Sequence, residues 1–331
     1  MRDWTEPGAH EVAPGVHRIP LPLPNDGLHA VNVYAIEDGE GLVLVDSGWA
    51  LAEAQDQLER ALNTLGRGFE DVTRFLVTHV HRDHYTLAVH LRRLYGSKIA
   101  LGIGEQPSLE RVLAGQAETM LTELYTWGAP HLAQTWAKLI EQIDRAKLLE
   151  DYDRPDEWLG ADEIGLEKRV LRVIPTPGHT RGHVVFADEQ AGLLFSGDHV
   201  LPHITPSIGF EPVRPELPLA DYLESLRITR NLPDMTLLPA HGPVAGSVHA
   251  RVDELLLHHE ERLVAMREAV RGTAYETARN VGWTRRQRKF DDLDLFNQVL
   301  AVGETAAHLD VLVKRGELTA KRIDGVLEYQ A

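Results

Sequence analysis

Short apolar runs rich in valine, isoleucine and leucine alternate along most of the chain with longer segments whose apolar residues recur at helical spacing. The runs are bounded by glycine, proline or polar residues, and they predict strands at residues 31–36, 41–45, 74–78, 98–102, 170–174, 193–196 and 236–238. The helical spacing predicts helices at residues 51–65, 86–95, 219–230 and 248–272. This alternation of strands and helices over residues 31–272 indicates the α/β class.

A stretch with a helical pattern, from about residue 105 to about residue 160, interrupts this alternation. It contains or adjoins Trp127, Trp136 and Trp158. One interpretation is that these rings pack the interior of the protein. The other is that the stretch is an inserted helical lid, which contributes apolar walls to a substrate pocket.

The pattern changes after Gly272. A short helix, a longer helix at residues 295–314 and two strands around Asp324 and Gly325 follow in the order of a winged-helix module. The sequence therefore predicts two domains. A large domain covers residues 1–272, with the helical insert at about residues 105–160, and a small winged-helix-like domain covers residues 273–331.

Composition restricts the chemistry that is available. The 331 residues include no cysteine, which excludes disulfides, thiol catalysis and thiolate zinc sites, so any metal must be held by His, Asp or Glu. No apolar run is long enough for a transmembrane helix, and the first residues lack the apolar stretch of a signal peptide. We therefore expect a cytoplasmic protein with no membrane partner.

The formal net charge of -16 is distributed unevenly. Residues 275–331 carry nine Lys/Arg and nine Asp/Glu, so the acidic excess lies entirely in the first 274 residues. An acidic body argues against a general nucleic-acid binder, which would have to neutralise phosphates. It does not exclude a local basic groove.

The segment THVHRDHY, residues 78–85, places three histidines and an aspartate within six positions. His79 and His81 directly follow a predicted strand, and alternate residues of extended backbone point to the same side, so both imidazoles can face one point. Asp83 and His84 follow where the chain turns towards a helix, and they project towards a neighbouring point. One short segment can therefore supply ligands to two adjacent metal ions.

Further side chains that can bind metals stand at the ends of other predicted strands. These side chains are Asp46, His179, Asp198 and His241. The carboxyl ends of strands are where α/β folds collect their sites. Five separate strand ends that deliver histidine or aspartate predict a common metal site.

This set of residues, in this order, resembles the five motifs of the metallo-β-lactamase superfamily over about residues 15–272. The resemblance implies an αββα sandwich, in which two mixed sheets face each other with helices outside and the active site lies at one edge. It also implies that His79, His81 and His179 hold one metal and that Asp83, His84 and His241 hold a second. Asp198 would bridge both metals, and Asp46 would orient a metal-bound imidazole.

Nitrogen and oxygen ligands of this kind suit Zn²⁺ and also admit Mn²⁺ or Fe²⁺. The resemblance therefore implies two zinc ions per chain that share a hydroxide, and this hydroxide would attack the substrate. Asp83 and Asp198 would take part in catalysis as well as in metal binding.

One position departs from the family pattern, because many members carry a small residue and then glycine where this chain has Tyr85 and Thr86. Thr86 would lie at the start of a helix and could cap it. Tyr85 either packs locally or lines the mouth of the site and donates its phenol to the substrate. His183 is expected to form a structural hydrogen bond near the site.

The segment after Asp198 contains two histidines whose function the sequence leaves open. His199 and His203 either are satisfied loop residues or bind substrate and donate a proton to a leaving group. His258, His259 and His308 lie on predicted helices and are expected to be surface or packing residues.

Three functions compete for this site. The first is hydrolysis of a thioester, ester or lactone of a small molecule, because the chain resembles the hydroxyacylglutathione hydrolase group; the tail would then cap the site or build a homodimer. The second is an endoribonuclease or other phosphodiesterase whose strand contact is the basic segment with Arg285, Arg286 and Arg288. The third is a metal-binding regulatory or scaffold protein without activity, whose winged helix would contact DNA or a partner. Weak β-lactam hydrolysis is a further alternative.

Overall fold

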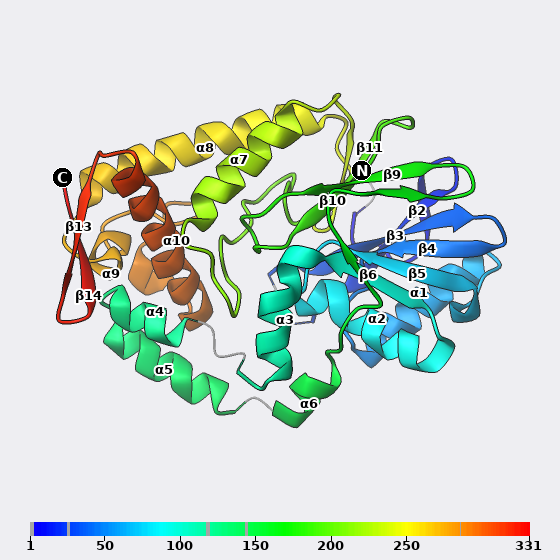
Figure 1. Cartoon of the computed structure of the whole chain (residues 1–331), viewed down its shortest axis with the longest axis horizontal. Coiled ribbons are helices and arrows are strands. Elements are labelled where there is room, and N and C mark those ends of the chain that lie inside the picture. Colours follow the sequence, from blue (N-terminus) through cyan, green and yellow to red (C-terminus); the bar gives the residue numbers. More distant parts are fainter. Residues whose placement is uncertain (1–2, 25–26, 117–119, 143–144, 285) are drawn as a thin grey trace.

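The computed structural model describes residues 3–24, 27–116, 120–142, 145–284 and 286–331. Within these ranges, two large sheets face each other, and helices cover the outer face of each, as Figure 1 shows. This is the αββα sandwich expected from the sequence. A small hairpin and a group of helices lie beside it at the carboxyl-terminal end of the chain.

The first sheet has the order β1-β2-β3-β4-β5-β6-β7 among the described residues. Its strands are β1 (His10–Ala13), β2 (Val16–Pro22), β3 (Ala30–Asp38), β4 (Gly41–Val45), β5 (Val72–Val77), β6 (Lys98–Gly102) and β7 (Glu157–Leu159). The strands from β1 to β4 pair antiparallel, whereas those from β4 to β7 pair parallel. The parallel half brings the carboxyl ends of β4 and β5 to the same edge.

The second sheet has the order β12-β11-β10-β9-β8 within the described part of the chain. Its strands are β8 (Glu163–Gly165), β9 (Val170–Pro175), β10 (Val184–Asp188), β11 (Leu193–Gly197) and β12 (Thr236–Pro239). Only the pair β11–β12 is parallel, so both of these strands end at the same edge. The third sheet is the hairpin of β13 (Thr319–Ile323) and β14 (Val326–Gln330).

Most strands of the sandwich are apolar on both faces because both faces are covered. On β3, Tyr34 and Ile36 face the second sheet, and the Tyr34 ring meets the Phe195 ring edge-on with centroids 5.4 Å apart. The alternate residues Val33 and Ala35 pack towards the helices outside the first sheet. Each residue buried in this way stabilises the fold by about 1.5–3 kcal/mol if its side chain is large.

The helices that cover the sandwich come from both halves of the chain. The first sheet is covered by α1 (Ala52–Thr64) and α2 (Arg82–Tyr95), and α3 (Gln106–Leu113) lies next to them. The second sheet is covered by α7 (Pro218–Arg230) and α8 (Val248–Ala269), whose apolar residues meet Val185 and Leu237 of that sheet. Short 3-10 turns lie at η1 (Phe69–Asp71), η2 (Ile103–Glu105) and η3 (Phe290–Asp292).

The insert is less uniformly helical than its pattern predicts. After α3 come α4 (Leu121–Thr126), α5 (Pro130–Ile140) and α6 (Arg145–Glu150), and then the chain forms strand β7. Trp158 therefore belongs to a strand that pairs with β6, not to a helix. Trp127 and Trp136 are 3% and 8% exposed, which agrees with the packing interpretation of these rings.

The carboxyl-terminal segment consists of α9 (Ala274–Ala278), η3, α10 (Leu295–Lys314) and the hairpin β13–β14. Its buried residues belong to the same hydrophobic cluster as the residues of α4, α5, α7 and α8. In Figure 1, α10 lies between α4 and α5 on one side and α8 on the other. The hydrophobic cluster thus continues across the domain boundary that the sequence predicts at residue 272.

Candidate metal centre

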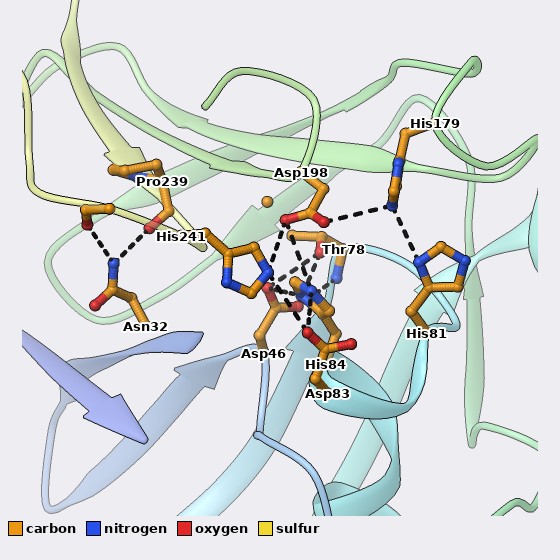
Figure 2. Close-up of polar contacts among 12 residues, drawn as sticks. Asn32, Asp46, Thr78, His81, Asp83, His84, His179, Asp198, Pro239 and His241 are labelled. Carbon is orange, nitrogen blue, oxygen red and sulfur yellow. Dashed lines mark hydrogen bonds and ion pairs between the residues drawn. The ribbon is translucent and has the colours of Figure 1, made fainter. Parts of the chain in front are cut away.

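The predicted site residues converge at the edge where β4, β5, β11 and β12 end. Asp46 follows β4, and His79 and His81 follow β5. Asp198 follows β11, and His241 lies two residues after β12. Figure 2 shows the labelled side chains of this cluster turned towards one another. The parallel pairing of β4 with β5 and of β11 with β12 is what brings them together.

Three imidazoles form the first group. The Nε2 atom of His79 lies 3.0 Å from Nδ1 of His81 and 3.2 Å from Nε2 of His179, and the last two atoms are 3.0 Å apart. Ligand nitrogens at tetrahedral positions about 2.0–2.1 Å from zinc would lie about 3.3 Å from one another. The spacing of these three atoms therefore suits one metal ion.

A carboxylate and two imidazoles form the second group. Oδ2 of Asp83 lies 3.5 Å from Nε2 of His84 and 3.4 Å from Nε2 of His241. Helix α2 begins at Arg82, so Asp83 and His84 occupy its first turn, four residues earlier than the sequence pattern predicts. Thr86 consequently lies inside the helix, where its hydroxyl donates to the Arg82 carbonyl and does not cap the amino terminus.

Asp198 stands between the two groups and presents a different oxygen to each. Its Oδ2 lies 3.4 Å from Nε2 of His179, and its Oδ1 lies 3.4 Å from Nε2 of His241 and 3.7 Å from Nε2 of His84. A carboxylate with this orientation can bridge two cations.

Hydrogen bonds to the far side of each ring fix which nitrogen faces the centre. The Nδ1–H of His84 donates to Oδ2 of Asp46 at 2.9 Å, and the Nδ1–H of His241 donates to the Ala30 carbonyl at 2.8 Å. Both rings therefore turn Nε2 towards the centre. Asn32 supports the His241 loop, because its amide donates to the carbonyls of Pro239 and Gly242.

One loop orients two rings of the first group. In the loop between β11 and α7, the Phe210 carbonyl accepts from Nε2 of His81 at 2.9 Å and the Ser207 carbonyl accepts from Nδ1 of His179 at 2.7 Å. The sequence gives no indication of these two positions. A backbone carbonyl is present at every residue, so no local signal distinguishes them.

His183 forms the structural hydrogen bond that the sequence predicts. Its Nε2 accepts the Asp198 N–H at 3.1 Å, and its Nδ1 pairs with the Thr176 hydroxyl at 2.9 Å. Gly197, directly before Asp198, has a φ of 50°, and a Cβ there would come within 2.7 Å of Nε2 of His183. Glycine is therefore required for Asp198 and His183 to approach each other.

Burial and charge affect the two groups in opposite ways. Burial lowers the pKa of His81 to about 4, with a further decrease from His179, and burial likewise lowers the pKa of His79. Burial alone would also lower the pKa of His84, but Asp83, Asp46 and Asp198 raise it to about 10. The first group is therefore neutral near pH 7, whereas the second holds a proton that a metal cation would replace.

The donor set fits a metal. Nε2 of His84, Nε2 of His241 and Oδ1 of Asp198 are buried, and across the described ranges they have no hydrogen-bond partner. Leaving three such atoms unpaired in one place is costly, and a cation would satisfy all of them. These donors, together with the first group, are nitrogen and oxygen atoms of the kind that zinc and other divalent ions bind.

Tyr85 does not reach this centre, which corrects the prediction that its phenol contacts substrate. The side chain is fully buried, and its hydroxyl donates to the Asp153 carbonyl at 2.5 Å. Its ring stacks on that of Tyr152 with centroids 6.1 Å apart. Tyr85 is therefore a packing residue, which is the other alternative that the sequence left open. Its apolar ring is directed into the core behind α2.

His199 and His203 occupy different environments although both follow Asp198. His199 is buried and turned away from the centre, and its Nε2 pairs with the Thr229 hydroxyl at 2.9 Å. Burial lowers its pKa to about 3, so it stays neutral and does not supply a proton. His203 is exposed on the loop between β11 and α7.

In the basic segment near the carboxyl terminus, the described side chains of Arg286, Arg288 and Lys289 are exposed, whereas the aromatic residue that precedes them is buried. Arg285 lies outside the described residues. Trp283 is 7% exposed and donates its indole N–H to the Ala278 carbonyl. Arg288 donates to the Asp292 carbonyl.

Two of the three histidines on the later helices are packing residues, which is one of the two alternatives that the sequence leaves open for them. His259 and His308 are buried against each other, with Nδ1 of His259 3.2 Å from Nε2 of His308.

Comparison with known families agrees with this geometry. The model of the Metallo-beta-lactamase superfamily matches residues 26–241, which is more than half of the chain. The protein therefore belongs to the metallo-β-lactamase superfamily. Its histidine and aspartate cluster suits the divalent metals that this superfamily binds, and the protein is accordingly a metal-dependent hydrolase by family.

Three similar proteins illustrate the range of the family. A probable metallo-hydrolase of Bacillus subtilis (strain 168) is 26% identical over 320 residues, which cover 92% of this chain and 93% of that protein. The crystal structure of a metallo-beta-lactamase family protein from Thermus thermophilus has a TM-score of 0.79 and 28% identity, and the match covers 96% of this chain and 99% of that one. An atrochrysone carboxyl ACP thioesterase of Aspergillus fumigatus is 22% identical over 257 residues, which are 78% of this chain and 48% of the thioesterase.

No helix in the described ranges is both long enough and apolar enough to cross a membrane.

Proposed function

We propose that the protein is a dinuclear metal hydrolase that cleaves a thioester, ester or lactone bond of a small molecule. The observation that carries the proposal is the orientation of Asp198, which offers one oxygen to each of two groups of metal-binding side chains. In this proposal His79, His81 and His179 hold one ion, Asp83, His84 and His241 hold the other, and Asp198 binds both. Zinc is the preferred metal, although the same donors accept Mn²⁺ or Fe²⁺.

Two bound ions would polarise a scissile carbonyl and lower the pKa of a water molecule between them, which supplies a nucleophile near neutral pH. The chain's own residues determine the position of that chemistry. Asp83, whose side chain is 17% exposed, faces the open side of the centre and can accept a hydrogen bond from the water. His203 is proposed as the donor of a proton to the leaving group, because it is exposed on the loop that passes the first group.

An aromatic surface beside the first group favours an acyl substrate with an apolar part. Trp136 of α5, Phe210 and Phe296 of α10 meet pairwise, with ring centroids between 5.5 and 6.5 Å apart. The carbonyl of Phe210 is the one that holds His81, so this surface begins at the centre itself. Phe296 is 45% exposed, and an apolar acyl group could cover it.

The likeness to a protein named as a thioesterase supports the same substrate class. The narrower assignments, to a hydroxyacylglutathione hydrolase-like group and to a winged-helix tail, remain predictions of the sequence.

The experiment is an activity panel with zinc-loaded protein. It compares acyl thioesters, aryl esters, lactones, a phosphodiester and a β-lactam, each with the parent protein and with Asp198→Ala. We expect the highest kcat/KM on an acyl substrate and none in Asp198→Ala, whose fold is checked by circular dichroism. Cleavage of the phosphodiester without acyl hydrolysis would contradict the proposal.

A further inference from the structure

Two glutamates lie directly behind the first imidazole group and are not among the candidate metal ligands. Glu105 closes the turn η2 after β6 and has no exposed surface, and Glu211 lies on the loop between β11 and α7 and is 2% exposed. Within the residues that the structure describes, neither carboxyl forms an ion pair with a lysine or arginine. Glutamates are seldom buried in this way without a structural or chemical requirement.

Glu105 contacts both segments that supply the first group. The Thr180 hydroxyl donates to Oε1 of Glu105 at 2.5 Å, and Thr180 directly follows His179. The N–H of Val80, which lies between His79 and His81, is also directed at this carboxyl. A single side chain thus joins two loops that are about a hundred residues apart in sequence.

Glu211 fixes the same region from the other side. Its Oε1 accepts the Arg181 N–H at 2.7 Å, and its Oε2 accepts the Ser108 hydroxyl at 2.7 Å. Its neighbour Phe210 supplies the carbonyl that orients His81. The position of that carbonyl therefore depends on how Glu211 is held.

The backbone around Glu105 leaves no room for adjustment. A Cβ on Gly182 would lie 2.0 Å from the Glu105 nitrogen, and a Cβ on Gly104 would lie 2.6 Å from Cα of Gly182. Turn η2 and the His179 loop therefore touch through their main chains. Such close packing transmits a change at Glu105 to the loop that carries His179.

The surroundings of the Glu105 and Glu211 carboxyl groups favour their protonated, uncharged form. Burial, together with Glu211, raises the pKa of Glu105 to about 8, and burial raises the pKa of Glu211 to about 7. Oε2 of Glu105 is buried without a hydrogen-bond partner in the described part of the chain. A protonated carboxyl, or an amide in its place, would keep the contact to Thr180.

We propose that Glu105 and Glu211 are positioning residues that hold the His79–His81 segment and the His179 loop at the separation the first metal requires. The inference rests on the proposed metal centre and is independent of which bond the protein cleaves. It predicts that the pair sets the affinity of one ion and leaves the other unaffected.

The test is a titration of metal-free protein with Co²⁺, followed by its visible absorption and by metal analysis. The same titration of His81→Ala identifies the first ion, because the binding phase that disappears in this variant belongs to the site that contains His81. We expect Glu105→Ala to weaken that phase about 10- to 100-fold and to leave the other phase unchanged. Glu105→Gln should bind both ions as the parent does, because its amide oxygen still accepts from Thr180.

The matched control is Glu304→Ala. Glu304 is another glutamate whose pKa is raised by burial, and it lies on α10, away from the centre. Its loss should lower the melting temperature without changing either cobalt phase. If Glu105→Ala fails to fold, Thr180→Val takes its place, since it removes only the donated hydrogen bond, and it should weaken the first phase by a smaller factor.

The inference would be overturned if folded Glu105→Ala bound both ions as tightly as the parent protein does, or if Thr180→Val did so where Glu105→Ala does not fold. It would also be overturned if the variant weakened both binding phases equally.

A different result would concern only the proposed function. If the parent protein bound two cobalt ions but hydrolysed no acyl substrate, the proposed function would be contradicted, and the role of Glu105 in metal binding would still stand.

Discussion

His84 donates its Nδ1–H to Oδ2 of Asp46 at 2.9 Å, and the other oxygen of Asp46 accepts from both the N–H and the hydroxyl of Thr78. Asp46 adopts a φ of 60°, which a non-glycine residue seldom does, and this backbone turn brings its carboxylate beneath the ring. The carboxylate therefore fixes the end of β5 and the tautomer of His84 at the same time.

The replacement Asp46→Asn can place the amide N–H of the new side chain against the Nδ1–H of His84, so that two donors face each other. It should weaken binding of the ion between Asp83, His84 and His241 by about 10- to 100-fold and spare the other ion. Competition titration with a chromophoric chelator measures both affinities. The control is Asp188→Asn, because Asp188 is a buried aspartate at the end of β10 that pairs with Arg169. This replacement should leave both affinities unchanged.

Metal binding should release protons near pH 7, and the second ion should release more of them than the first. The reason is that Asp83, Asp46 and Asp198 outweigh burial and raise the pKa of His84 to about 10, whereas burial lowers the pKa of His81 to about 4. The affinity for the second ion should therefore rise with pH. Calorimetric titrations in buffers of different ionisation enthalpy count the protons, and equal release by the two ions would contradict this assignment.

Phe296→Ala should raise KM for substrates with long or aromatic acyl groups by about tenfold and leave acetyl substrates unchanged. The loss corresponds to about 1.4 kcal/mol, which is within the range expected for uncovering one aromatic contact. Steady-state kinetics with a series of acyl chain lengths provide the measurement. Tyr95→Ala, an equally exposed aromatic residue at the end of α2, should show no dependence on chain length.

Tyr85→Phe should keep its catalytic activity and lose about 1 kcal/mol of stability, because only the hydrogen bond to the Asp153 carbonyl disappears. Urea unfolding and kcat measured on the same preparation separate the two effects. A tenfold fall in kcat at unchanged metal content would restore Tyr85 as a catalytic residue.

The paired His259 and His308 should make the protein less stable as the pH falls. Burial lowers the pKa of His308 to about 3 and keeps His259 well below 6.5. Below about pH 6.5 these histidines bind protons in the unfolded chain but not in the folded chain. Their contribution to the free energy of unfolding is therefore fully present above that pH and declines towards pH 3. His308→Gln should reduce the slope by about 1.4 kcal/mol per pH unit, and chemical unfolding between pH 4 and 7 tests it.

The sequence alone was sufficient to predict the α/β class and the convergence of the candidate ligands, because strand ends and histidine spacing are local signals. The sandwich was predicted from the resemblance to the metallo-β-lactamase superfamily. It did not predict β7, since a three-residue strand inside a helical pattern is defined by its pairing with β6. It also placed the start of α2 at Thr86, because the first turn consists of polar residues without apolar periodicity.

The side-chain contacts behind the centre could not be derived in that way. The direction of the Tyr85 side chain depends on its contact with Tyr152, which is distant in the sequence. The residues around Tyr152 contain no pattern that indicates this contact. The role of Glu105 depends in the same way on Thr180, which the fold brings next to it. Such contacts are properties of the assembled chain, not of any one stretch.

His81, His179 and His241 are all oriented by main-chain carbonyls, those of Phe210, Ser207 and Ala30. A carbonyl survives almost any change of the side chain that accompanies it. Apart from Glu211, which holds the Phe210 carbonyl in place, the loop between β11 and α7 can therefore diverge in sequence while the imidazoles keep their orientation. The shape of the surface offered to a substrate would change with it. Descendants of this chain could thus acquire new substrates by mutation of that loop without first losing the ability to bind metal.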